Sequence, residues 1–260
     1  MKQVVITGST RGLGFAMARA FLAAGCSVTI SGRNEANLSK AYAELKHYKH
    51  VLPVLCDVQD PVQLRNLWQV AYDRWGQVDY WINNAGIAQL HQPLWELEIG
   101  EIEQVININL MGTIYGSRVA MQGMLKQGEG QIFNVEGFGS NDMFRPGMSL
   151  YGTSKRAITY YTRALAKEAA QTGILVGLLS PGMMVTDFVK KPRDGSASVD
   201  AQTRRIFNLL GDRPETVANY LVGRILANKR NNVRFEWLNR SRLIWRIATS
   251  GIMKRELFDC

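Results

Sequence analysis

The chain of 260 residues contains only three cysteines and three histidines. Cys26, Cys56 and Cys260 lie far apart and form no C-x-x-C pair, so the sequence indicates neither a disulfide framework nor a zinc site, and no metal is expected. No run of eighteen apolar residues occurs, so we expect no membrane-spanning helix. The N-terminus also lacks the apolar core and cleavage site of a signal peptide, which favours a cytoplasmic protein.

The composition is that of an ordinary globular protein, with 46% hydrophobic and 20% charged residues, which excludes a disordered or fibrous chain. The net charge is +9, and most of the excess lies in residues 224–260, which hold nine basic and three acidic side chains. This segment is either a solvated helix face or a peripheral contact with an anionic membrane or partner. Nucleic-acid binding is not expected, because no recognition motif accompanies the charge. The basic residues are interleaved with Leu243, Ile244, Trp245 and Ile247.

Short apolar runs alternate with longer amphipathic ones along most of the chain. Strands are predicted at 4–6, 27–30, 51–55, 78–82, 131–135 and 174–179. Helices are predicted at 14–24, 35–46, 62–74, about 101–127 and about 150–171. Short strands that are apolar on both faces and separated by helices are typical of a parallel sheet covered on both sides. Right-handed crossovers then give a Rossmann-like, doubly wound α/β fold.

No linker, repeat or low-complexity stretch divides the chain. The sequence therefore predicts a single cofactor-binding domain over 1–228, with a basic amphipathic tail over 229–260. Residues 187–213 mix charge, glycine and serine with a short apolar run, as is typical of a lid that closes over substrate.

A glycine-rich turn follows the first predicted strand and opens the first helix. Glycines let the backbone turn tightly and let a pyrophosphate approach the helix N-terminus, where unpaired N–H groups and the helix dipole favour an anion. We expect the whole turn to bind a dinucleotide. Its residues are Gly8, Ser9, Thr10, Arg11, Gly12, Leu13 and Gly14.

Two arginines indicate which nicotinamide nucleotide binds. Arg11 lies within the turn, and Arg33 follows the second predicted strand, where NAD-preferring sites commonly place a carboxylate; here no carboxylate precedes Glu35. Guanidinium groups match a ribose 2′-phosphate in charge and donor geometry. The sequence therefore predicts NADP(H) as cofactor, with a solvated surface charge as the alternative for either arginine.

Tyr151 and Lys155 stand four residues apart near the start of the helix predicted at about 150–171. Residues at this spacing share a helix face. A tyrosine hydroxyl has a pKa of about 10, and a nearby ammonium lowers that pKa by stabilising the phenolate. The pair is a candidate acid–base centre, although Tyr-x-x-x-Lys alone also describes a surface pair.

Several motifs follow the glycine turn in a fixed order. They are Asn83-Asn84-Ala85-Gly86, Asn109-Leu110-Met111-Gly112, Tyr151 with Lys155, and Pro181-Gly182 followed by Thr186. Together these motifs resemble the short-chain dehydrogenase/reductase superfamily over nearly all of residues 1–228.

The resemblance implies a role for each matching residue. Tyr151 would be the general acid/base, Lys155 would bind the nicotinamide ribose and lower the pKa of Tyr151, and Asn109 would hold a water of the proton relay. The superfamily acts on small molecules, and its long helices, here 101–127 and 150–171, pair between subunits, which implies a homodimer or homotetramer. The further cofactor contacts implied are Asp57 and Val58 at the adenine, Asn84, Ala85 and Gly86 along the trough, and Pro181, Gly182, Met184 and Thr186 near the carboxamide.

One position departs from the superfamily pattern. A carbonyl-polarising serine is usual about thirteen residues before the tyrosine, where this chain has Phe138. Either Ser140 takes that role or the role is missing; Ser149 lies too close to the helix start to be preferred. Residues 132–140, together with Trp81-Ile82-Asn83-Asn84, look like the chlorophyll b reductase branch, whose Gly-x-Gly-Ser loop supports Ser140.

Members of that branch reduce a formyl group of chlorophyll b with a reduced nicotinamide cofactor. The resemblance thus implies NADPH-dependent reduction of an aldehyde or ketone on a bulky apolar molecule, with Tyr151 as proton donor. Two alternatives stay open. One is a reductase of more ordinary carbonyl substrates, such as 3-oxoacyl thioesters, sterols or sugars, and the other is an NADP-binding sensor without turnover.

Overall fold

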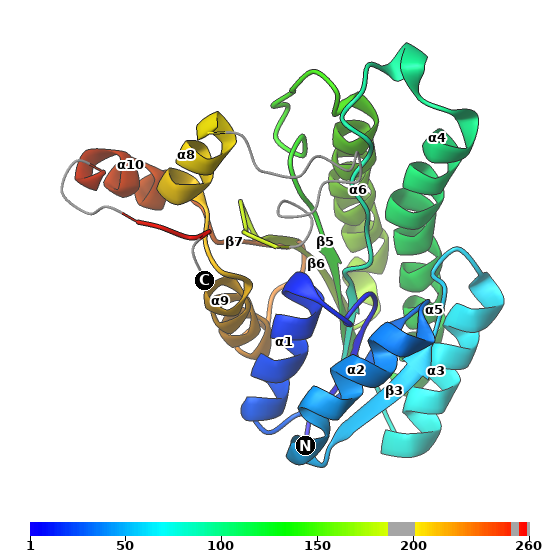
Figure 1. Cartoon of the computed structure of the whole chain (residues 1–260). Helices are drawn as coiled ribbons and strands as arrows, with labels where there is room; N and C mark the ends of the chain where they lie inside the picture. The colour runs from blue at the N-terminus through cyan, green and yellow to red at the C-terminus, as the bar shows by residue number, and fades with distance from the viewer. Residues whose placement is uncertain (187–200, 251–254, 259–260) are drawn as a thin grey trace.

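The structure, a computed structural model, describes residues 1–186, 201–250 and 255–258. At its centre is a seven-stranded parallel sheet in the order β3-β2-β1-β4-β5-β6-β7 (Figure 1). The strand order reverses between β1 and β4, which makes the carboxyl ends of these strands the expected place for a ligand. This arrangement confirms the Rossmann-like parallel fold. The strands are β1 (Gln3–Ile6), β2 (Ser27–Gly32), β3 (Val51–Leu55), β4 (Tyr80–Asn83), β5 (Gly130–Val135), β6 (Ile174–Ser180) and β7 (Val233–Glu236).

The predicted helix starts follow ordinary capping chemistry. Asn34 Oδ1 accepts the backbone N–H of Asn37, and Asp60 Oδ1 accepts the N–H of Val62 behind Pro61, so each side chain satisfies one N–H at a helix start. The α-helices are α1 (Gly12–Ala23), α2 (Glu35–Leu45), α3 (Pro61–Trp75), α4 (Ile99–Ile106), α5 (Gly112–Gln127), α6 (Ser149–Glu168), α8 (Ala201–Leu210), α9 (Pro214–Leu226) and α10 (Arg240–Thr249).

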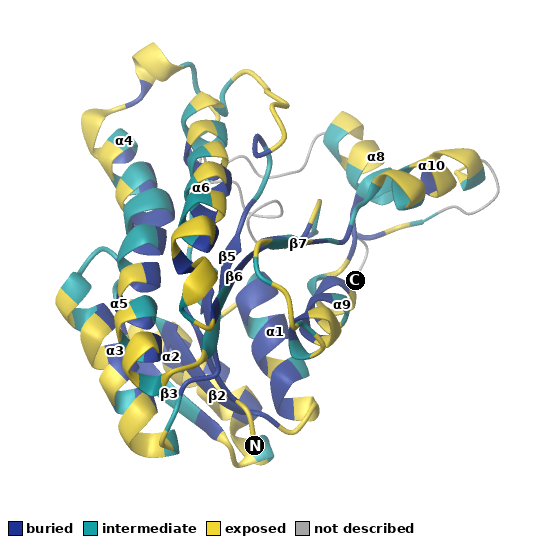
Figure 2. Ribbon diagram, turned by 180° about the vertical axis from the view of Figure 1, so that it is seen from behind, coloured by how far each residue is buried: buried dark blue, intermediate teal, exposed yellow. Residues whose placement is uncertain are grey.

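Helices cover both faces of the sheet, which explains why its strands are apolar throughout. Val4 and Ile6 of β1 pack into a core with α1, α2 and α9, whereas Val5 between them packs into a second core with α3, α5 and α6. Successive side chains of a strand point to opposite faces, so each strand supplies both cores. Figure 2 shows the resulting buried centre and exposed outer helix faces.

The chain beyond residue 228 begins with a strand of the same sheet. β7 pairs in parallel with β6, and the Phe235 ring stacks on that of Phe133 in β5, with 5.9 Å between centroids. The predicted division between a domain at 1–228 and a tail at 229–260 therefore falls just before a sheet strand. Of the predicted lid at 187–213, residues 187–200 lie outside the described residues, and residues 201–210 form α8.

One buried carboxylate neutralises part of the C-terminal charge. Asp212, between α8 and α9, accepts hydrogen bonds from Trp237 Nε1 at 2.5 Å and Arg255 Nη2 at 2.6 Å, and it also pairs with Arg246 of α10. α10 lies beside α8 (Figure 1).

Helix α10 also exposes Ile244, Trp245 and Ile247. Within the described residues, no helix is long and apolar enough to cross a bilayer.

Candidate active site

The glycine turn packs closely against the segment that follows β4. Gly8 has a φ of +61°, and a Cβ there would lie 2.7 Å from Ala85 Cα, so only glycine fits both the backbone and the space. A Cβ at Gly14 would lie 2.4 Å from Asn84 Nδ2. Asn84 Nδ2 donates to the carbonyl oxygens of Thr7 and Gly8, both at 2.9 Å. The predicted turn and the Asn84–Gly86 motif are thus one unit at the carboxyl ends of β1 and β4.

The turn is also joined to β2 and leaves the start of α1 open. Ser9 Oγ accepts the N–H of Ser31 at 2.8 Å, and the Thr10 methyl group lies against Gly32. The N-cap residue of α1, Arg11, makes no side-chain capping hydrogen bond. The first N–H groups of a helix have no partner within the helix. Their direction and dipole suit a phosphate, so the turn fits the pyrophosphate of a dinucleotide.

The two arginines predicted for the cofactor lie at the same edge of the sheet. Arg11 and Arg33 are both exposed, and within residues 1–186, 201–250 and 255–258 neither forms an ion pair with a carboxylate. Asp57, after β3, accepts the N–H of Gln59 at 3.0 Å, and the neighbouring Val58 is buried against Gly112. Two exposed arginines thus follow the carboxyl ends of β1 and β2, next to the glycine turn.

Asn109 lies in a π-helical segment, Asn107–Met111, that joins α4 to α5. The sequence predicted one regular helix over 101–127, and the local widening is a feature often found at functional sites. The Asn109 side-chain oxygen accepts the N–H of Ile87 at 2.8 Å, and its nitrogen donates to Ile87 O at 3.0 Å and to Ser154 Oγ at 3.2 Å. The amide is therefore fixed between the Gly86 segment and α6.

Lys155 reaches from α6 to the end of β5. Its side chain is buried, and its Nζ donates to the carbonyl oxygen of Val135 at 3.2 Å. A Cβ at Gly86 would lie 3.2 Å from the Asn109 side-chain oxygen and 3.5 Å from Lys155 Nζ. These distances bring Gly86, Asn109 and Lys155 together at one point. Burial lowers the pKa of Lys155 to about 8, and the negative charge of Glu136 opposes this effect.

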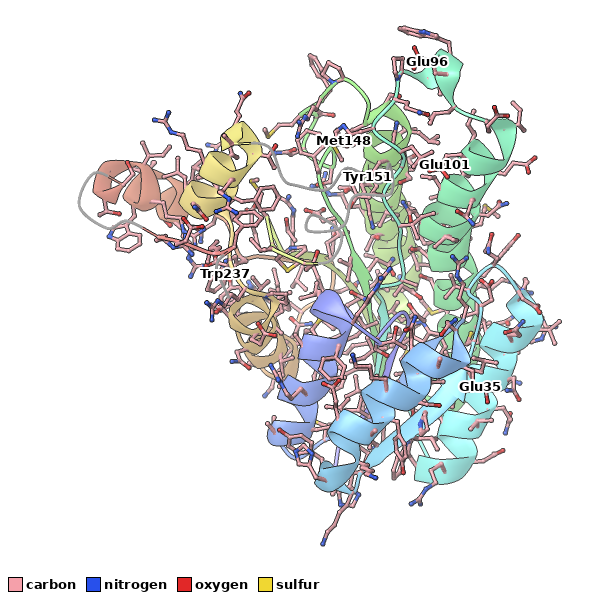
Figure 3. All side chains as sticks on the ribbon, viewed as in Figure 1. Glu35, Glu96, Glu101, Met148, Tyr151 and Trp237 are labelled. Atoms are coloured by element: carbon pink, nitrogen blue, oxygen red, sulfur yellow. The ribbon has the colours of Figure 1, made fainter. Side chains whose placement is uncertain are left out.

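Tyr151 lies near the N-terminal end of α6, above the carboxyl ends of the central strands (Figure 3). Its ring centroid is 5.7 Å from Lys155 Nζ, and a Cβ at Gly137 would lie 2.6 Å from its hydroxyl oxygen. Burial raises the pKa of the Tyr151 hydroxyl above its usual range. This differs from the expected lowering by Lys155, because removal of water from the hydroxyl is the dominant effect here.

Ser140 lies in the turn that begins at Gly137. Its N–H donates to Gly137 O at 3.1 Å, its carbonyl accepts from Arg156 Nη1 at 2.9 Å, and the residue is buried. Gly139, between them, lies against Gly152 of α6, where a Cβ would be 2.5 Å from the Gly152 Cα. The glycines thus let the Ser140 loop approach the first turn of the helix that carries Tyr151. The role of Ser140 as the carbonyl-polarising residue stays a prediction.

The segment after β6 passes over the glycine turn. A Cβ at Gly12 would lie 3.7 Å from the Thr186 methyl carbon. Gly182, after the buried Pro181, has a φ of +69°, and Met184 forms a parallel bridge with Asp212. The predicted carboxamide-binding segment therefore reaches the start of α1.

Sequence reasoning missed two buried polar residues around Tyr151. Gln89 Oε1 accepts the N–H of Tyr151 at 2.8 Å, which caps α6 from outside the helix. Glu136, between Val135 and Gly137, is a fully buried carboxylate paired with Arg234 of β7. The contacts from Gln89 to Tyr151 and from Arg234 to Glu136 join residues 62 and 98 positions apart in the sequence, so no local sequence pattern predicts them.

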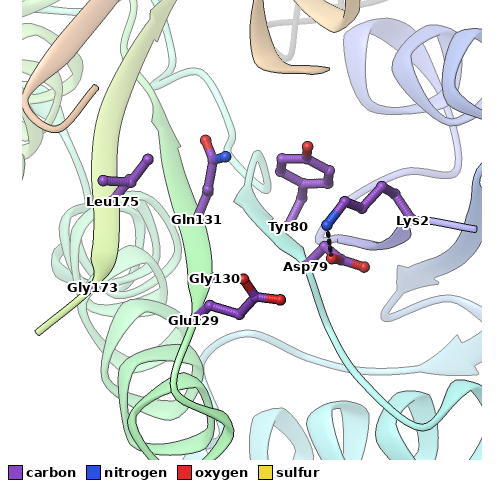
Figure 4. Close-up of a pocket in the computed structure, with 8 residues that line it drawn as sticks. All are labelled: Lys2, Asp79, Tyr80, Glu129, Gly130, Gln131, Gly173 and Leu175. Atoms are coloured by element: carbon purple, nitrogen blue, oxygen red, sulfur yellow. Dashed lines mark hydrogen bonds and ion pairs between the residues drawn. The ribbon is translucent and has the colours of Figure 1, made fainter. Parts of the chain in front are cut away.

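A separate hollow lies at the opposite edge of the sheet (Figure 4). It contains the ion pair between Lys2 Nζ and Asp79 Oδ1, 2.6 Å apart. Ligand sites of open parallel sheets lie at the carboxyl ends of the strands, and this hollow is at the amino end of β5. We therefore place the active site at Tyr151 and not here. The hollow is lined by Lys2, Asp79, Tyr80, Glu129, Gly130, Gln131, Gly173 and Leu175.

Two plant proteins are similar to the chain in sequence. The probable chlorophyll(ide) b reductase NYC1, chloroplastic, of Oryza sativa subsp. japonica is 32% identical over 277 residues, which cover 99% of this chain and 54% of that protein. The chlorophyll(ide) b reductase NOL, chloroplastic, of Arabidopsis thaliana is 36% identical over 231 residues, covering 86% and 65% respectively. The chain thus spans about half to two thirds of these relatives, and the expected likeness to the chlorophyll b reductase branch is confirmed.

A solved structure and a family model agree with this result. A variant of actinorhodin polyketide ketoreductase with NADPH matches the fold with a TM-score of 0.79 and 26% identity, over 90% of this chain and 95% of that chain. The model of the short chain dehydrogenase family matches residues 2–197. The chain therefore belongs to the short-chain dehydrogenase family.

Proposed function

We propose that the protein is an NADP(H)-dependent reductase that converts an aldehyde or ketone of a bulky apolar molecule to the alcohol. One observation carries the proposal. The buried Lys155 amine, the Asn109 amide and the Tyr151 hydroxyl lie together at the carboxyl ends of β4 and β5, next to a glycine turn that can hold a dinucleotide.

The residues that would hold the cofactor fit NADP(H). The pyrophosphate would bind at the open N-terminus of α1, and the ribose 2′-phosphate would lie against Arg11 and Arg33. Gly86 would leave room for the nicotinamide ribose beside Lys155, and Thr186 would bond the carboxamide above Gly12. A related ketoreductase has been crystallised with NADPH, which supports the choice of this cofactor.

The chemistry assigns one task to each polar group of the site. The cofactor, when bound, would supply a hydride to the carbonyl carbon. Tyr151 donates its hydroxyl proton to the carbonyl oxygen, and the Lys155 ammonium stabilises the phenolate that forms. Asn109 holds the water through which the proton is replaced, and Ser140 donates a hydrogen bond to the same carbonyl oxygen.

The substrate is proposed to carry a formyl group on a large flat ring system, as in chlorophyll(ide) b. The names of the plant relatives support this choice. A second support is the loop before α6, which exposes Met143 and Phe144, with 92% of Phe144 accessible. Apolar side chains at the mouth of the site suit a large apolar ligand, and methionine adapts to its shape.

The test is reduction of chlorophyllide b by the purified protein with NADPH, followed by the absorbance of both pigment and nicotinamide. Tyr151→Phe should abolish turnover with NADPH affinity nearly unchanged. Tyr160→Phe, an exposed position on the same helix, is the matched control and should retain full activity. A 3-oxoacyl thioester is the competing substrate, and turnover of that compound alone would refute the tetrapyrrole proposal.

The assembly is also a proposal. By the family likeness, α5 and α6 would pair between subunits, and α6 exposes the large Tyr160 side chain (78%) on its outer face. Tyr160→Glu would place a charge in that interface. Size-exclusion chromatography with light scattering should show a dimer or tetramer that Tyr160→Glu weakens.

Peripheral membrane contact through the C-terminal region is a separate proposal. α10 presents exposed Ile244, Trp245 and Ile247 in a basic segment, a combination that suits an anionic lipid surface. The protein should co-sediment with vesicles that contain phosphatidylserine, and Trp245→Ser should reduce the fraction of protein bound to them. Equal vesicle binding by the unaltered protein and by Trp245→Ser would refute membrane contact through α10.

A further inference from the structure

Glu136 is a buried carboxyl group beside the active site that the proposed chemistry does not use. It follows Val135, whose carbonyl accepts the Lys155 hydrogen bond, and precedes Gly137, which faces the Tyr151 hydroxyl. Its side chain is 0% exposed. A carboxylate removed from water in this way is costly unless it is paired and hydrogen-bonded, so its partners decide what it does.

Both oxygens of Glu136 are held by side chains from other elements. Arg234 of β7 donates to Oε1 from Nε at 2.8 Å and from Nη2 at 2.5 Å. Thr159 of α6 donates to Oε2 at 3.1 Å. Arginine remains charged at any ordinary pH, so Arg234 places a positive charge directly against this carboxyl group at the end of β5.

The same carboxyl group is linked to the Lys155 turn of α6 through Thr159. Thr159 stands four residues after Lys155 on the same helix face, and its hydroxyl also lies 3.1 Å from the Lys155 carbonyl oxygen. In the described part of the chain, the titratable groups around the Lys155 amine are Tyr151 and Glu136, with Arg234 behind Glu136. Burial favours the neutral amine, and the Glu136 charge opposes this by raising the pKa of Lys155.

We infer that Glu136 is a positioning residue that keeps the Lys155 ammonium charged beside Tyr151, and that Arg234 of β7 fixes Glu136 for this task. The inference rests on the proposed function for what Lys155 does, but not for how Lys155 titrates. It gives β7 a part in the active site, although this strand carries no residue of the sequence motifs. The alternative is that the ion pair merely fastens β7 to β5.

The chain contains a matched control for separating these roles. Glu236 also pairs with Arg234, at 3.4 Å from Nη1, but it is exposed and lies at the end of β7. Glu136→Gln and Glu236→Gln each remove one carboxylate from the same arginine, and only the first removes the charge that acts on Lys155.

The experiment is an NMR titration of the protein with ¹³C-labelled lysine side chains, in which the Lys155 signal is assigned by its loss in Lys155→Arg. With Glu136→Gln, the Lys155 midpoint should move by roughly 1 pH unit or more toward acid, as expected on loss of a neighbouring opposite charge. With Glu236→Gln it should stay in place. The alkaline limb of the pH–rate profile for carbonyl reduction should move by the same amount in Glu136→Gln alone.

An unchanged Lys155 midpoint in Glu136→Gln would overturn the inference and leave a structural ion pair. If Glu136→Gln does not fold, the Lys155 midpoint is measured in Glu136→Asp instead. The shorter side chain keeps a carboxylate for Arg234 but moves it farther from α6. The Lys155 midpoint should then move toward acid by a smaller amount, and no movement overturns the inference. The titration needs no substrate, so a shifted midpoint without turnover of any carbonyl would refute the proposed function alone.

Discussion

The Tyr151 hydroxyl oxygen occupies the place next to Gly137 where any other residue would carry a side chain, because a Cβ at this glycine would lie only 2.6 Å away. Gly137 follows β5 by two residues, and Tyr151 lies in the first turn of α6. The absence of a side chain at 137 thus lets the helix bring its phenol to the end of the sheet.

Gly137→Ala should therefore displace the Tyr151 hydroxyl and lower kcat. A displacement of about 1 Å of a reacting group costs roughly 100-fold in rate, with little effect on NADPH affinity because the glycine turn is untouched. Steady-state kinetics with NADPH and a carbonyl substrate measures the effect. Gly223→Ala, in α9, is the control and should be neutral, because the new Cβ would have no side chain or other segment of the chain within 4 Å apart from its own neighbours and helix backbone. Equal activity of both variants would show that the hydroxyl does not act from this place.

Ser140→Ala tests which group polarises the carbonyl oxygen. If Ser140 does so, its loss should lower kcat by roughly 100-fold, as for removal of one oxyanion donor. Ser149→Ala serves for comparison, because Ser149 is exposed at the first position of α6. Comparable rates for the two variants would remove Ser140 from the mechanism.

Much of this site follows from sequence, and the reason is that its parts are local. The glycine turn, Asn109 and the Tyr151/Lys155 pair each depend on a neighbouring strand end or on one turn of helix. The role of Glu136 does not follow from local sequence, because its ion-pair partner Arg234 lies 98 residues away along the chain. β7 was likewise missed, because Val233–Glu236 is short and carries two charges, which masks the apolar pattern of a sheet strand.

The elevated pKa of Tyr151 was not foreseen for a related reason. The spacing to Lys155 predicts a neighbouring positive charge, but it does not show how deeply the hydroxyl is buried. The structure places Lys155 Nζ against the Val135 carbonyl, and burial of both groups favours their neutral forms. Charge on Lys155 thus depends on the other groups around it.

Arg33→Ala should weaken NADPH binding much more than NADH binding. A hydrogen bond to a charged group contributes about 1.5–3 kcal/mol, which corresponds to a roughly 10- to 100-fold rise in the Kd for NADPH. Fluorescence titration with each nucleotide measures both constants. Arg230 is also exposed but lies in the loop between α9 and β7. Arg230→Ala therefore removes the same charge elsewhere and should change neither Kd. Equal weakening of NADPH and NADH would refute the contact with the 2′-phosphate.

Carbonyl reduction should decline as the pH rises through about 8, the pKa of Lys155. Below that value the amine is charged and can stabilise the Tyr151 phenolate that forms when the proton is donated. Above it the amine is neutral, so Tyr151 becomes a weaker acid and proton donation slows. The profile of kcat against pH with saturating NADPH measures this limb. Lys155→Met should remove the limb and leave a low, flat rate, whereas a limb that persists in Lys155→Met would assign the titration to another group.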